Sequence, residues 1–165
     1  MATARSIQSP MESSLYMEAM LTPASREQRG AYLLLRLVAG MDFFGHGFAR
    51  IFTGTHLSGF AHWMVGDMAK APLPAGLVLA TGYVVPCVEL LIGILLLTGV
   101  ATRFGLTLAL LLMIVLMFGV TMKQDWNVAG QQLLYGLVLA LLLYGRARLD
   151  LSWPRVFGSV PGREG

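Results

Sequence analysis

Charged residues and cysteines are both scarce in this chain. Only 13% of its 165 residues are Asp, Glu, Lys or Arg, whereas 56% are hydrophobic, and soluble domains typically carry about 25% charge. The net charge of +3 is small and no basic run with interleaved aromatics occurs, so nucleic acid is not expected as a partner. Cys87 is the single cysteine, which excludes an intrachain disulfide and a CxxC redox pair. The composition therefore favours an integral membrane protein.

Four continuous apolar segments are long enough to cross a bilayer, which takes about 20 residues. They are residues 31–52, 76–98, 104–122 and 128–144. Continuous rather than alternating apolar runs predict helices, because a membrane helix satisfies its own backbone hydrogen bonds. We therefore expect an all-α fold, an integral membrane four-helix bundle surrounded by the lipid bilayer.

The link between the first two segments has a helical pattern of its own. Apolar residues between Leu57 and Met68 recur at helical spacing, Trp63 is suited to anchoring at the lipid–water interface, and Pro72 and Pro74 follow. This pattern predicts a short amphipathic interfacial helix between spans one and two, with a plain loop as the alternative.

The distribution of basic residues near the ends of the spans predicts the orientation. One side would carry Arg50, Lys70 and Lys123, and the other Arg26, Arg29, Arg103, Arg146, Arg148 and Arg155. We therefore expect a multi-pass protein of the inner (cytoplasmic) cell membrane with both termini in the cytoplasm. Residues 1–29 would be a mobile cytoplasmic segment, residues 30–152 the membrane domain and residues 153–165 a tail.

The first span contains four ionisable residues, which are Arg36, Asp42, His46 and Arg50. At about 100° per residue they lie on one side of a helical wheel, flanked by Gly40 and Gly47. A charge at the centre of a bilayer costs at least about 2.5–3.5 kcal/mol, so such residues are functional candidates by default. The flanking glycines would let a neighbouring helix approach closely.

The second span supplies Glu89 at a similar depth in the membrane. At about 1.5 Å per residue, Asp42 is roughly 16 Å, Glu89 roughly 13 Å and Arg36 roughly 7 Å from the cytoplasmic end. An Arg36–Glu89 ion pair is expected if the two faces meet. We take Asp42, His46 and Glu89 as candidate proton-exchange groups, and these three with Arg36 as a candidate quinone or ion-pair cluster. The alternative is a structural polar core that fixes helix packing.

Metal and haem chemistry have little support in the sequence. Of the three histidines only His46 lies deep in a span, and no Glu-x-x-His pairs of a di-iron bundle occur. We find no haem, flavin or iron–sulfur motif, and expect no metal site.

The segment "LLLRLVAGMDFFGHGFARIF" resembles the opening helix of the DoxX family of small four-span membrane proteins. The matching positions in this helix are Arg36, Gly40, His46, Gly47 and Arg50, and those in the second span are Glu89, Gly93, Gly99 and Arg103. The ending "YGRARLDLS" is similar to the closing element of the family, at Gly145, Leu149 and Asp150. Asp42 is outside the family pattern.

This resemblance implies a link to membrane quinone chemistry, because the family includes subunits of thiosulfate:quinone oxidoreductase. We therefore expect an oxidoreductase subunit that acts on quinone or quinol and receives electrons from a redox partner or other subunits of a membrane complex. One alternative is a non-enzymatic accessory or assembly subunit of a larger membrane redox or photosynthetic complex. Another is a small transporter or proton channel, although no broken helices or inverted halves occur.

Overall fold

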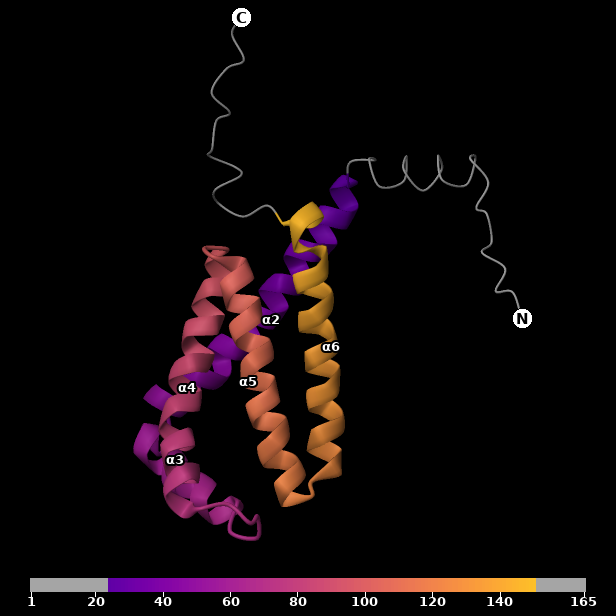
Figure 1. Cartoon of the computed structure of the whole chain (residues 1–165). Helices are drawn as coiled ribbons and strands as arrows, with labels where there is room; N and C mark the ends of the chain where they lie inside the picture. Colours follow the sequence, from indigo (N-terminus) through magenta and orange to yellow (C-terminus); the bar gives the residue numbers. More distant parts are fainter. Residues whose placement is uncertain (1–23, 151–165) are drawn as a thin grey trace, which may run out of the picture.

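The computed structural model describes residues 24–150, which form five helices and no strand (Figure 1). The helices are α2 (Arg26–Phe52), α3 (His56–Asp67), α4 (Ala75–Thr98), α5 (Thr102–Lys123) and α6 (Trp126–Leu149). The predicted all-α fold is confirmed. The tail expected at 153–165 and all but the last six residues of the segment 1–29 lie outside the described residues.

Local capping residues explain where the helices begin and end. α2 begins at Arg26 rather than near residue 31, because Ser25 and Gln28 form a capping box that satisfies the first free amides. The Asp125 side chain accepts from the Val128 amide and caps α6. Gly99 ends α4 with a φ of +73°, a conformation that glycine adopts without strain.

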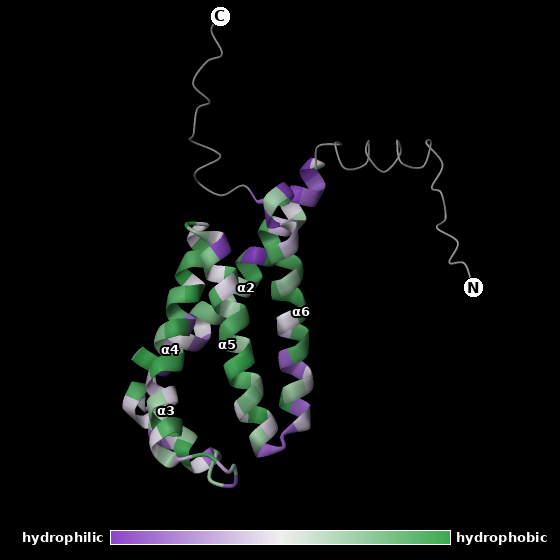
Figure 2. Cartoon of the chain, in the orientation of Figure 1, coloured by the Kyte–Doolittle hydropathy of each residue, from purple (hydrophilic) through white to green (hydrophobic). Residues whose placement is uncertain are grey.

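Three of the four predicted spans are confirmed as helices long and apolar enough to cross a membrane, namely α4, α5 and α6. α2 is the longest helix at 27 residues but is not among these three, and its apolar part is interrupted by Arg36, Asp42 and His46. Figure 2 shows hydrophobic residues along most of α4 and α5, and hydrophilic residues near the start of α2 and at the α5–α6 turn.

The helix predicted between Leu57 and Met68 is confirmed as α3. It packs against the first half of α4, where Ala61 is fully buried next to Gly82. A Cβ atom added at Gly82 would lie 2.7 Å from the Ala61 Cα, so the two helices touch through their backbones.

The four long helices form a ring in which each helix contacts its two neighbours. α4 packs most extensively against α2 and also contacts α5, α5 pairs with α6, and α6 returns to α2. The largest fully buried side chains of the core are Ile92, Leu96, Leu106, Leu139 and Leu142, with Pro86 on α4. Figure 1 shows α5 and α6 as an antiparallel pair and α2 crossing behind α4.

Candidate functional site

A partly buried ion pair joins α2 to α4. Arg50 Nη1 donates to both carboxylate oxygens of Glu89, whose side chain is only 5% exposed. The Arg50 guanidinium also lies 4.7 Å from the ring centroid of Phe60 on α3, in a cation–π arrangement. Burying a lone charge is costly, and here each group offsets the charge of the other.

Two glycines bring α2 and α4 close enough for this pair to form. A Cβ atom added at Gly47 would lie 2.7 Å from both the Leu90 Cα and the Pro86 carbonyl oxygen. One added at Gly93 would lie 2.5 Å from the Phe44 Cα. Small residues at such contacts let two membrane helices pack backbone against backbone, and the approach sets Arg50 level with Glu89.

The Arg50–Glu89 pair lies in the wall of a cavity of about 360 Å³, which we call the inner cavity. All five described helices contribute to it, α3 with Phe60 and Trp63 and α6 with Val128 and Gln132. Most of the lining is apolar, so the few polar groups would fix the orientation of a bound molecule.

Two further polar features border the inner cavity. The Gln132 Oε1 atom is buried and has no hydrogen-bond partner among residues 24–150. At another edge Lys123 Nζ donates to both carboxylate oxygens of Asp67, at 2.9 and 2.8 Å, and ties α5 to α3. Buried polar atoms normally have partners, so the amide of Gln132 is available to a ligand or to water.

A second buried ion pair lies at the opposite end of the bundle. Arg36 Nη1 is 2.8 Å from Asp150 Oδ1 and 3.5 Å from the Thr102 hydroxyl oxygen, and all three residues are buried. The guanidinium also lies against Gly99, where an added Cβ would be 2.8 Å from Nη1. This pair fastens the first half of α2 to the end of α6.

Asp42 and His46 lie on the flank of α2, outside both ion pairs. Their carboxylate and imidazole groups are 3.6 Å apart, and their side chains are 35% and 52% exposed. Asp42 lines a shallow crevice between α2 and α6. Both residues remain close enough to Glu89 to interact with its charge.

The predicted cluster of Arg36, Asp42, His46 and Glu89 is therefore divided among three places. The expected Arg36–Glu89 ion pair is replaced by Arg36–Asp150 and Arg50–Glu89. The helical wheel also predicted the wrong buried face for α2. The residues of α2 that are buried are Tyr32, Arg36, Gly40, Phe43 and Gly47. Asp42 and His46 are rotated away from that face.

The relative depth of the two helices explains the exchange of partners. The sequence estimate set residue 31 level with Thr98, but Gly40 packs against Leu97 and Gly47 against Leu90. α2 is therefore displaced along α4 by about two helical turns, roughly 11 Å. This displacement brings Arg36 to the α4–α5 turn and Arg50 to Glu89.

The described residues together form a small helical protein with three helices suited to a bilayer and ionisable groups buried among them, as in an integral membrane protein. Residues 31–122, more than half of the chain, match the sequence model of DoxX. The chain belongs to the DoxX family, as the resemblance predicted. No curated protein and no solved structure matches it. Within residues 24–150, no three His, Cys, Asp or Glu side chains are grouped so that they could hold a metal ion.

Sequence reasoning missed three contributors to these sites, namely Arg50 as the partner of Glu89, Asp150 as the partner of Arg36, and Gln132 in the inner cavity. The sequence did contain a signal for Arg50 and Asp150. Glu89, Asp150, Arg36 and Arg50 all occupy positions of the family pattern, so both acids had arginines of the same pattern as possible partners. No signal in the sequence distinguished Gln132 from the exposed Gln131.

Proposed function

We propose that α2 is a fourth membrane span and that α3 lies in the interface. At 1.5 Å per residue, α2 is about 40 Å long, more than the roughly 30 Å of a hydrocarbon core. It packs along α4, and the two arginines within its apolar part, Arg36 and Arg50, are paired with acids of other segments. Residues 30–152 would then form a four-helix domain of the inner membrane with both termini in the cytoplasm.

We propose that the inner cavity binds the head group of a quinone or quinol, and that the chain is a subunit of a membrane oxidoreductase. The observation that carries this proposal is the Glu89 carboxylate, held by Arg50 in the wall of an otherwise apolar cavity. A quinone ring needs apolar walls for its faces and polar groups for its oxygens. Phe60 and Trp63 would supply the former, and Glu89 and Gln132 the latter.

In this mechanism a quinol gives up two electrons and two protons: Glu89 accepts the proton of one ring hydroxyl, and the other hydroxyl, which is hydrogen-bonded to the Gln132 amide, releases its proton to water. Arg50 holds the carboxylate in position and balances its charge when the proton leaves. Asp42 and His46 pass protons between the flank of α2 and Glu89. Electrons are exchanged with a partner subunit. Arg36 has a different role, holding the far end of the bundle together.

Quinol titration of the purified protein tests this proposal. We expect saturable binding of a benzoquinol by the native chain, and an affinity about tenfold lower for Glu89→Gln, whose neutral amide cannot make the charge-assisted hydrogen bond that the Glu89 carboxylate accepts from a quinol hydroxyl. His62→Gln, on α3 but outside the inner cavity, is the matched control and should bind like the native chain. Absence of saturable binding by the native chain would refute the proposal.

An accessory or assembly subunit is the second candidate function, and the half-exposed Asp42 and His46 favour it. Ionisable groups within a membrane helix normally face protein or water rather than lipid. A neighbouring subunit covering this flank would satisfy them without any quinone chemistry. Copurification of the native protein with a redox or photosynthetic complex, with no quinone binding of its own, would identify this role.

A further inference from the structure

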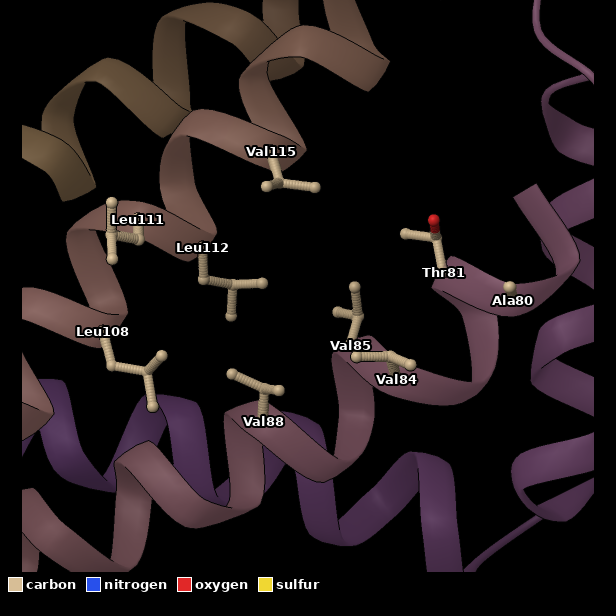
Figure 3. A pocket seen from close by; sticks show the side chains of 9 residues that line it. All are labelled: Ala80, Thr81, Val84, Val85, Val88, Leu108, Leu111, Leu112 and Val115. Atoms are coloured by element: carbon tan, nitrogen blue, oxygen red, sulfur yellow. The ribbon is translucent and has the colours of Figure 1, made fainter. Parts of the chain in front are cut away.

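An apolar groove runs along the outer surface between α4 and α5 (Figure 3). We call it the α4–α5 groove. It has a volume of about 350 Å³ and is lined by Ala80, Thr81, Val84, Val85 and Val88 from α4 and by Leu108, Leu111, Leu112 and Val115 from α5. Figure 3 shows these side chains on the facing sides of the two helices.

The groove is suited to hydrocarbon. Val85 and Leu112 are buried and form its floor, while Val84 and Leu111, 57% and 55% exposed, form its two rims. Thr81 has the single side-chain hydroxyl of the lining, and that hydroxyl donates to the Leu77 carbonyl at 2.9 Å. The lining therefore presents methyl and methylene groups to whatever occupies it.

The groove adjoins the inner cavity. Thr81, Val85 and Val115 line both spaces. A molecule with a polar head and an apolar tail could thus place its head near Glu89 and pass its tail between α4 and α5. An ordinary acyl chain would fill the groove alone, whereas the adjacency of the two spaces matches a ligand that occupies both.

We propose that the α4–α5 groove holds the hydrocarbon tail of a lipid-soluble quinone whose head group occupies the inner cavity. The inference rests on the proposed function and names its substrate class. The substrate is a tailed quinone that enters sideways from the membrane between α4 and α5, and not a small quinone taken from water.

Groove-filling variants test this inference with two ligands, a decyl-tailed benzoquinone and the same benzoquinone without its tail. Leu111→Trp and Val84→Trp fill the groove from its two walls. Ile114→Trp is the matched control, because Ile114 is 66% exposed on α5 but lines neither space. Dissociation constants are measured in the same lipid nanodiscs, and each variant is compared with the native chain for each ligand separately.

We expect both groove variants to weaken binding of the tailed quinone by at least about tenfold, because each buried methylene contributes roughly fourfold in affinity. Both groove variants should bind the tail-free quinone with a dissociation constant within about twofold of the native value. This result would also show that the variants fold. Ile114→Trp should change the dissociation constant of neither quinone.

Three results would overturn the inference, and they are distinguishable. If the groove variants weaken both ligands equally, or leave tailed-quinone binding unchanged, the tail does not lie in the groove and the quinone site still stands. If a photoreactive phospholipid labels the groove and the tailed quinone does not displace it, the groove is a boundary-lipid site. If the native chain binds neither ligand saturably, the proposed function falls and this inference with it.

Discussion

Glu89 and Arg50 are the residues on which the proposed site depends, because the partly exposed Arg50 offsets the charge of the buried Glu89 carboxylate. Removing one partner leaves an uncompensated charge, which typically costs about 3–5 kcal/mol, whereas replacing both by apolar residues is often neutral. We therefore expect Arg50→Met to destabilise the protein strongly and the double variant Arg50→Met/Glu89→Leu to recover most of that loss. Thermal unfolding in detergent measures both. A double variant as unstable as the single one would show that the pair does more than cancel charge.

The sequence predicted which residues of α2 and α4 are chemically unusual, but not how they pair. Arg36, Asp42, His46 and Glu89 were identifiable because ionisable groups stand out in apolar segments. Pairing depends on the relative depth of two helices, and segment lengths do not determine it. The contact of Gly40 with Leu97, which shows the displacement, depends on tilt and backbone approach that the sequence does not reveal.

The α2–α4 pair is the element on which the arrangement of the bundle depends. Gly47 faces the α4 backbone without space for a Cβ atom, whereas Gly45, two residues earlier, has nothing within 4 Å. We expect Gly47→Ala to destabilise by about 1–3 kcal/mol, the usual range for overpacking a tight contact. Gly45→Ala is the matched control and should be neutral or slightly stabilising, because alanine favours the helix. Denaturant unfolding of both variants checks this, and equal effects would contradict the contact.

Helix positions were predicted well because long apolar runs and helix stop signals are local properties. α4 and α5 begin and end within two residues of the expected spans. α6 extends five residues beyond the expected residue 144 and includes Arg146 and Arg148. Arginine has a high helix propensity, so the helix can continue after the apolar segment has ended. The inner cavity could not be predicted, since it is lined by side chains of all five described helices and so depends on how those helices pack.

At the scale of the whole molecule, the two ends of the bundle differ in how they are held. One end is closed by Arg36 and Asp150, which join the first and last of the long helices. The other end surrounds the inner cavity and is held by the ion pairs Arg50–Glu89 and Lys123–Asp67. Because the Arg36–Asp150 pair holds the helices together at one end and the inner cavity lies toward the other, a ligand can enter without separating all the helices. This arrangement agrees with sideways entry between α4 and α5.

The proposed topology makes a prediction about the chain as a whole, because α2 decides whether both ends lie on the same side. If α2 crosses the bilayer, Glu27 at its start lies on the side of Val100 in the α4–α5 turn, and Ser58 on α3 lies on the side of Asn127. If α2 does not cross, Glu27 and Ser58 share a side. All four positions are exposed and suit single cysteine substitutions in a Cys87→Ala background.

We expect a membrane-impermeant thiol reagent applied to intact cells to label Ser58→Cys and Asn127→Cys. Glu27→Cys and Val100→Cys should be labelled only after the membrane is opened, because the positive-inside rule predicts that the arginine-rich side faces the cytoplasm. The Val100 and Asn127 variants are internal controls, since α5 separates them whatever α2 does. Labelling of Glu27→Cys together with Ser58→Cys would show that α2 lies along the surface. The Arg50–Glu89 pair would then lie near the interface, where water competes for its hydrogen bonds and a quinone site within the bilayer would lose its basis.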